Sequence, residues 1–122
     1  MKKILIVDDS KTTRQVLTFA LTDAGYTVLE AVDGMEAFQF LEQEQFDLLI
    51  TDLKMPRMDG LELTRKVRAS SGHKFMPIII LTTESSDEKK QEGKKAGASC
   101  WIVKPFKPEQ LLQVVNMSLS QH

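Results

Sequence analysis

Hydrophobic residues along the chain alternate between two spacings. The first spacing is a short, nearly continuous apolar run rich in β-branched residues, which occurs at residues 4–7, 27–29, 46–50, 78–81 and 100–103. Runs that are apolar at successive positions are typical of parallel strands covered by helices on both faces. The sequence therefore predicts five strands, most of them in the interior of the protein.

The second spacing is helical and fills the segments between the runs. One apolar stripe follows residues 11–24, and Gly25 comes directly after it as a helix stop. Asp33 precedes a second stripe at residues 37–41, and a third stripe covers residues 61–67. These segments predict the first three helices.

Two further helices are marked by their ends. Ser85 and Glu88 have the spacing of a capping box, and Gly97 is suited to end that fourth helix. Pro108 is suited to the first position of a fifth helix. Strict alternation of five strands and five helices predicts an α/β fold, a doubly wound five-stranded parallel sheet with right-handed crossovers.

Composition narrows the class of protein. The 122 residues are the size of one domain, and 42% hydrophobic with 27% charged residues is ordinary for a globular protein. A single cysteine, Cys100, cannot form an internal disulfide bond, and no apolar run approaches the length of a membrane span. We therefore expect a cytoplasmic protein without membrane insertion, and the net charge of −1 does not favour binding to nucleic acid.

Polar residues follow four of the five predicted strands. Asp8 and Asp9 follow the first strand, Asp52 the third, Thr82 the fourth and Lys104 the fifth. Parallel α/β sheets bind ligands at the carboxyl ends of their strands, so these side chains are expected to gather at one edge. Three clustered carboxylates repel one another unless a cation is present.

This set of groups favours magnesium-dependent phosphoryl transfer. An oxygen-only cluster suits Mg²⁺, and Mn²⁺ is expected to substitute for it. With a lysine close by, the chemistry that fits is transfer of a phosphoryl group to the Asp52 carboxylate as nucleophile. The metal, Lys104 and the Thr82 hydroxyl are each expected to bind one oxygen of the transferred group.

The same residues resemble a known family. Asp8-Asp9, the sequence DLKMPRMDG at 52–60, TTE at 82–84 and KPF at 104–106 resemble the receiver domain of two-component response regulators, over essentially the full length. The aspartate pair followed by serine resembles the single-domain chemotaxis type (CheY-like). The resemblance implies a flavodoxin-like (βα)5 fold with strand order 2-1-3-4-5, and residues 1–122 as a single receiver domain with no output domain.

The resemblance also implies roles for the acidic residues. Asp52 would receive its phosphoryl group from the phosphohistidine of a sensor histidine kinase, of the chemotaxis type. Asp9, Asp52 and the backbone carbonyl of Lys54 would bind Mg²⁺ directly, and Asp8 would act mostly through water. Lys104 would pair with Asp52 and then with the phosphoryl group, and its bond to Pro105 would be cis.

Signal output is implied as well. Thr82 would move toward the phosphoryl group, and the aromatic residue three positions before the lysine, here Trp101, would turn inward. The face made by the fourth helix, fifth strand and fifth helix would then bind a downstream protein target, with the receiver itself a monomer. The fourth helix has almost no apolar stripe and contains a central glycine, so we expect it to be mobile, with a lysine-rich surface.

Two residues are candidates for control of the phosphoryl lifetime. Lys54 lies two residues after Asp52, and Glu84 lies two residues after Thr82. The two would flank the path of the attacking water, and an ion pair between them would slow self-dephosphorylation.

Other functions are compatible with parts of this pattern. A non-chemotaxis regulator such as a single-domain phosphorelay intermediate would have much the same sequence. A phosphohydrolase of the haloacid dehalogenase type, a true enzyme, usually carries an acidic residue where this chain has Lys54. A flavodoxin would need a phosphate-binding loop in place of Asp8-Asp9. A receiver that serves only for docking would not need all five signature residues, so we expect a signalling receiver and not an enzyme acting on other substrates.

Overall fold

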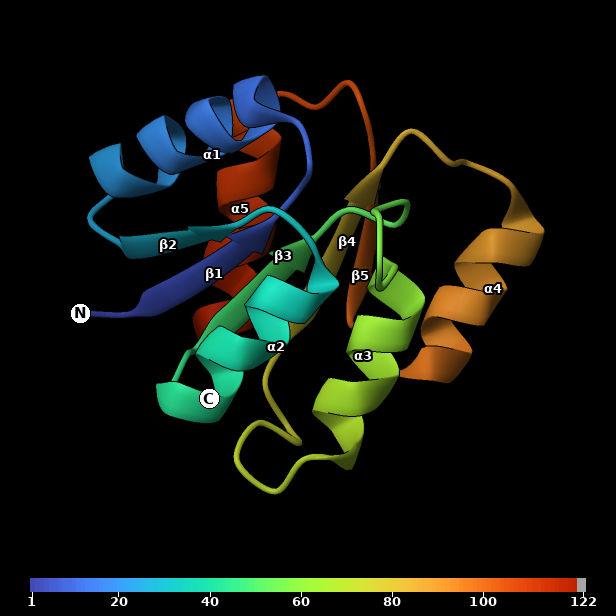
Figure 1. Cartoon of the computed structure of the whole chain (residues 1–122). Helices are drawn as coiled ribbons and strands as arrows, with labels where there is room; N and C mark the ends of the chain where they lie inside the picture. Colours follow the sequence, from blue (N-terminus) through green and yellow to red (C-terminus); the bar gives the residue numbers. More distant parts are fainter. Residues whose placement is uncertain (121–122) are drawn as a thin grey trace.

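The computed structural model describes residues 1–120, which form five strands and five helices in strict alternation (Figure 1). The strands are β1 (Lys3–Val7), β2 (Thr27–Ala31), β3 (Leu48–Thr51), β4 (Ile78–Thr82) and β5 (Cys100–Val103). The helices are α1 (Lys11–Asp23), α2 (Gly34–Gln43), α3 (Gly60–Ala69), α4 (Asp87–Ala96) and α5 (Pro108–Ser120).

All five strands are parallel and lie in the order β2-β1-β3-β4-β5. The predicted fold and the implied strand order are therefore confirmed. Helices α1 and α5 cover one face of the sheet, and α2 and α3 cover the other, with α4 beside α3 (Figure 1). In the described part of the chain, no helix combines the length and the apolar character needed to cross a membrane.

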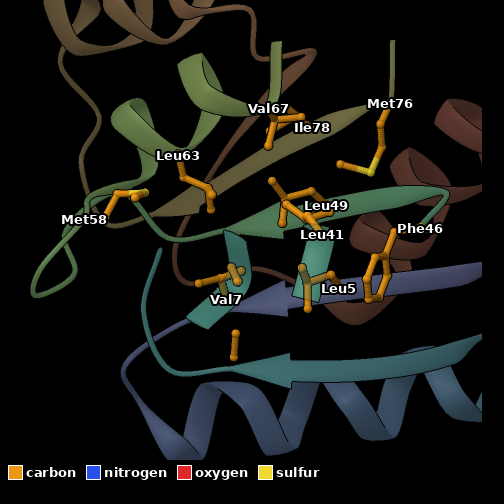
Figure 2. Close-up of a cluster of buried hydrophobic side chains, with 12 residues drawn as sticks. Leu5, Val7, Leu41, Phe46, Leu49, Met58, Leu63, Val67, Met76 and Ile78 are labelled. Atoms are coloured by element: carbon orange, nitrogen blue, oxygen red, sulfur yellow. The ribbon is translucent and has the colours of Figure 1, made fainter. Parts of the chain in front are cut away.

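The core consists of two main layers, one on each face of the sheet. Alternate residues of each central strand point to opposite layers, so Leu5 and Val7 pack under α2 and α3 while Ile4 and Ile6 pack under α1 and α5. Figure 2 shows the first of these layers, with Leu49 and Leu63 near its middle. The edge strands β2 and β5 are less buried than the three central strands.

Most predicted helix ends are correct. Asp33 caps α2 by accepting a hydrogen bond from the Glu36 backbone N–H, and Gly97 ends α4 in the left-handed conformation at φ 109°. The predicted cap of α4 is wrong by one residue, because Ser86 and not Ser85 accepts the hydrogen bond from the Lys89 N–H.

The third strand also begins later than predicted. Residue 46 was expected to open it, but the Phe46 backbone N–H bonds to the imidazole Nε2 of His73 at 3.1 Å, outside the sheet. The Phe46 side chain is nevertheless buried in the core (Figure 2). Its apolar character therefore reflects packing and not strand pairing.

Candidate functional site

Three carboxylates meet at the carboxyl end of the sheet. Asp8 and Asp9 follow β1, and Asp52 follows the neighbouring strand β3. One carboxylate oxygen from each lies within 4.8 Å of the others; Asp8 is buried, Asp52 is half-buried and Asp9 is exposed. The cluster is therefore open to solvent on one side and enclosed on the other.

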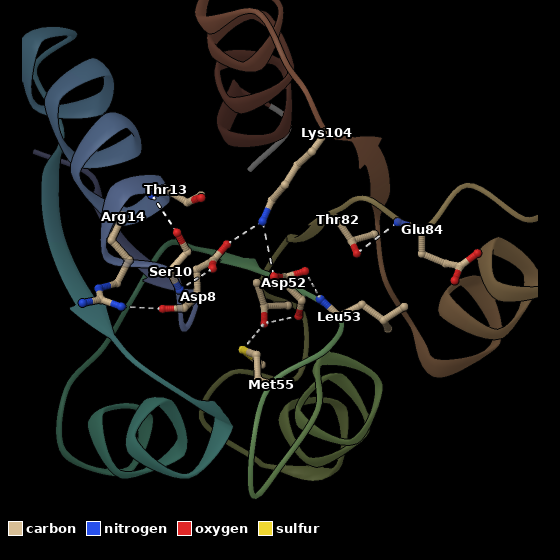
Figure 3. A network of polar contacts seen from close by, with 11 residues as sticks. Asp8, Ser10, Thr13, Arg14, Asp52, Leu53, Met55, Thr82, Glu84 and Lys104 are labelled. Atoms are coloured by element: carbon tan, nitrogen blue, oxygen red, sulfur yellow. Dashed lines mark hydrogen bonds and ion pairs between the residues drawn. The ribbon is translucent and has the colours of Figure 1, made fainter.

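A lysine partly neutralises this cluster. The Lys104 Nζ lies 2.8 Å from Asp8 Oδ2 and 3.3 Å from Asp52 Oδ2 (Figure 3). Burial would lower the pKa of the Lys104 ammonium, but the hydrogen bond to Asp8 and the charges of Asp52 and Asp8 outweigh it, so the pKa is raised. The ammonium thus makes the pair with Asp52 that the resemblance implied, and it also pairs with Asp8, to which it lies closer.

The backbone holds Lys104 at this position. Its N–H donates to the Thr82 carbonyl at 2.7 Å, which joins the ends of β4 and β5. The peptide bond between Lys104 and Pro105 is cis, as the resemblance implied.

The donor atoms of the cluster suit a hard divalent cation. All are carboxylate oxygens, and each of the three residues offers one. Backbone N–H groups hold two of the carboxylates in place: that of Ser10 bonds to Asp8 Oδ1 at 2.9 Å, and that of Leu53 to Asp52 Oδ1 at 2.7 Å. Each carboxylate oxygen has two lone pairs, so these single bonds and those from Lys104 leave the cluster able to accept a cation, and the residues present fit Mg²⁺.

Sequence reasoning missed one residue that supports the cluster. The Arg14 guanidinium donates from Nη1 to the Asp8 carbonyl at 2.7 Å and from Nε to Glu30 Oε1 at 3.1 Å. It thereby ties the loop after β1 to the end of β2. The sequence feature that could have indicated this role is the position of Arg14, a basic residue in the first turn of the helix that follows the aspartate pair.

Thr82 is the last residue of β4 and is buried. Its Oγ1 accepts a hydrogen bond from the Glu84 N–H at 3.3 Å (Figure 3). The hydroxyl proton is therefore free to be donated elsewhere, to an oxygen placed beside the acidic cluster.

Glu84 does not form the ion pair that was considered for it. Within residues 1–120 no ion pair joins Glu84 to Lys54; the Glu84 carboxylate accepts from the Ser86 N–H at 3.1 Å instead. The hydrogen bonds with Ser86 lower the pKa of Glu84, and the charges of Lys54 and Lys89 contribute less. Ser86 is close in sequence, and its N–H competes successfully for the carboxylate.

Trp101 is half-buried on β5 and fits against a notch in α4. A Cβ added to Gly93 would lie 2.7 Å from the ring atom Cζ3, so the ring occupies the space that any other residue would need. The indole Nε1 donates to the Glu84 carbonyl at 2.9 Å. The central glycine of α4, which looked only like a weak point in the helix, therefore accommodates the tryptophan.

Comparison with known proteins shows which family has this sequence pattern. The family model of the response regulator receiver domain matches residues 4–116. A chemotaxis protein CheY homolog of Campylobacter jejuni is 47% identical over 111 residues, covering 89% of this chain and 85% of that protein.

Solved structures of receiver proteins are similar to this chain as well. Chemotaxis protein CheY4 of Vibrio cholerae matches with a TM-score of 0.94 and 50% identity, over 98% of this chain and 99% of that one. The receiver domain of sensor histidine kinase PA1611 from Pseudomonas aeruginosa, with magnesium in its active-site cleft, matches with a TM-score of 0.91 and 28% identity, over 98% of both chains. The fold, the acidic cluster bridged by a lysine and these matches lead to one conclusion: the chain belongs to the family of response regulator receiver domains.

Proposed function

We propose that this protein is a phosphorylation-activated switch that accepts a phosphoryl group on Asp52 from a phosphohistidine. The observation that carries the proposal is the Lys104 ammonium bridging Asp8 and Asp52 beside a third carboxylate. A carboxylate oxygen of Asp52 would attack phosphorus as the bond from phosphorus to the imidazole nitrogen breaks. The products are an acyl phosphate and, because the phosphohistidine ring reacts with its other nitrogen protonated, a neutral imidazole on the kinase.

Asp9, Asp52 and the Lys54 carbonyl would hold Mg²⁺ directly, with Asp8 acting through water. The oxygen-only donor set and the magnesium in the related PA1611 receiver support this assignment. When bound, the ion supplies positive charge that offsets the negative charge of the carboxylates and the phosphoryl oxygens.

Lys104 and Thr82 would bind the remaining oxygens of the phosphoryl group. The Lys104 ammonium is already held near Asp52, so it needs only to exchange a carboxylate oxygen for a phosphoryl oxygen. The Thr82 hydroxyl can donate to another because it acts as an acceptor in its hydrogen bond with the Glu84 N–H. Positioning of this kind is the main contribution of a protein to phosphoryl transfer.

The signal would leave through the face formed by α4, β5 and α5. Movement of Thr82 is coupled to Trp101 because both contact Glu84, through its N–H and its carbonyl respectively. Lys90, Lys94 and Trp101 line one hollow on this face. A target bound there would sense a change at the acidic cluster as a change in shape.

The similarity to chemotaxis proteins supports a role in chemotaxis, with a chemotaxis-type histidine kinase as donor. We propose that this receiver domain is monomeric and catalyses only its own phosphorylation and dephosphorylation. The free thiol of Cys100 is in keeping with the reducing cytoplasm.

The test is the intact mass after incubation with Mg²⁺ and acetyl phosphate. Wild type should gain one phosphoryl group, EDTA should prevent the gain, and Asp52→Asn should abolish it. Asp59→Asn is the matched control, because Asp59 is an exposed aspartate that caps α3. An unchanged mass in wild type, together with no binding of beryllofluoride in the presence of Mg²⁺, would contradict the proposal.

A further inference from the structure

An arginine in the loop after β3 has a strained backbone. Arg57 has φ 68° and is the only residue other than glycine with positive φ in the described part of the chain. The Met58 N–H donates to the Pro56 carbonyl at 2.8 Å, so the three residues form a γ-turn centred on Arg57. This type of turn is rare, and such strain persists only where the surroundings hold it in place.

The arginine side chain provides that restraint. Arg57 Nε and Nη2 lie 2.8 and 2.5 Å from the same oxygen, Oδ2 of Asp33. The other oxygen of Asp33 accepts from the Glu36 N–H at 2.9 Å and so caps α2. The ion pair thus joins the loop after β3 to the first turn of α2.

The burial of Asp33 distinguishes this contact from an ordinary surface ion pair. Only 4% of Asp33 is exposed, although 61% of the Arg57 side chain is, and a buried carboxylate depends on its partner more than the carboxylate of a fully exposed pair does. Burial would raise the pKa of Asp33, but the Glu36 hydrogen bond and the Arg57 guanidinium lower it overall. The carboxylate therefore stays charged and available to Arg57.

A second contact joins the same two segments. A Cβ on Gly34 would lie 2.6 Å from the carbonyl oxygen of Met58 and 2.8 Å from its Cβ. The loop backbone is therefore packed directly on the start of α2, one residue along from the ion pair. Together, the two contacts restrain the far end of a loop that begins at Asp52.

We propose that Arg57 is a positioning residue, which clamps the loop after β3 to Asp33 so that the Lys54 carbonyl is held ready for the divalent cation. This inference rests on the metal site of the proposed function. Lys54 lies between Asp52, anchored by its strand, and Arg57, anchored by Asp33. Loss of the ion pair leaves the packing of Met58 on Gly34 as the remaining restraint of the two, so the intervening backbone gains motion, and a mobile carbonyl is a poorer ligand.

The test is direct titration of Mg²⁺ by calorimetry on wild type, Arg57→Ala, Arg57→Lys and Asp33→Asn. Asparagine still caps a helix, so Asp33→Asn removes the ion pair and spares α2. Asp59→Asn is the control, because Asp59 caps α3 as Asp33 caps α2, by accepting a hydrogen bond from the backbone N–H three residues later, here that of Glu62. Metal affinity should fall roughly tenfold in Arg57→Ala and Asp33→Asn, the low end for groups that orient ligands, and less in Arg57→Lys.

The double variant, Asp33→Asn with Arg57→Ala, should bind no more weakly than either single variant because both remove one clamp. Should Arg57→Ala fail to fold, Asp33→Asn and Arg57→Lys still test the proposal. Wild-type affinity in these variants would refute the clamp, even if unfolding showed a loss of stability. Absence of Mg²⁺ binding in wild type itself would instead refute the proposed function.

Discussion

The fit between Trp101 and α4 can be tested by adding one methyl group. Replacing Gly93 with alanine removes a helix-weakening glycine, which in an open helix stabilises by about 1 kcal/mol. Here, however, the new Cβ would lie 2.7 Å from Cζ3 and 2.9 Å from Cε3 of the Trp101 ring. Contacts this short require the ring to move, and overpacking of this kind costs about 1–3 kcal/mol.

The gain in helix propensity and the clash with the ring have opposite signs, so the effect of Gly93→Ala on stability depends on whether Trp101 is present. In wild type, Gly93→Ala should lower the free energy of unfolding by about 1 kcal/mol, since the clash outweighs the gain in helix propensity. In a Trp101→Ala background the clash is absent, and the same change should stabilise by about 1 kcal/mol. The coupling energy between the two sites is therefore about 2 kcal/mol.

Urea unfolding followed by circular dichroism measures all four proteins of this cycle, including those without tryptophan. Fluorescence provides a second readout in the proteins that keep Trp101, the one tryptophan of the chain. Displacing the ring should shift its emission as the Nε1 contact with the Glu84 carbonyl is lost. Equal stabilisation by Gly93→Ala in both backgrounds would show that the ring does not occupy the notch.

Three further predictions concern acid stability, phosphoryl lifetime and helix dynamics. Burial lowers the pKa of His73 from its usual 6.5, so the unfolded chain binds a proton at this residue more readily than the folded chain does, and the free energy of unfolding should fall as the pH drops below 6.5. Urea unfolding at pH 7 and pH 5 measures this loss of stability, which His73→Gln should reduce; an equal loss in the variant would show that His73 does not cause it. Because no ion pair to Glu84 holds the Lys54 side chain in place among the described residues, Lys54→Asn should change the phosphoryl lifetime little; intact mass against time measures it, and a much shorter lifetime would show that Lys54 obstructs the attacking water. Amides in α4 should exchange rapidly with deuterium in the unphosphorylated protein, because only Gly93 and Ala96 of this helix are buried, and strong protection of residues 88–95 would contradict this.

Much of the fold was predictable because its signals are local. Apolar runs and helical stripes follow from the two periodicities of secondary structure, and alternation of the two restricts the topology to a parallel sheet. The clustering of Asp8, Asp52 and Lys104 was also predictable, because parallel strands bring their carboxyl ends to one edge. The boundary at Phe46 was not, because a residue packed in the core and a residue paired in a strand are both apolar.

Several contacts that sequence reasoning missed are polar and depend on the path of a loop. Arg57 and Asp33 are 24 residues apart, and no spacing or motif in the sequence indicates that they form a pair. The choice of Ser86 over Ser85 as the cap of α4 likewise depends on where the chain leaves β4. Contacts of this kind are set by loop geometry, which periodicity does not encode.

The amino-acid sequence by itself determined the order of strands and helices, the family and the residues available for chemistry, because each depends on residue type at a fixed spacing. Tertiary structure decided how those residues are paired: Lys104 bridges two carboxylates, and Glu84 bonds to Ser86 and not to Lys54. It also explains the central glycine of α4, because the packing places the Trp101 ring where a side chain on Gly93 would lie. The physical reason is that pairing depends on distances between segments, and these exist only once the sheet has formed.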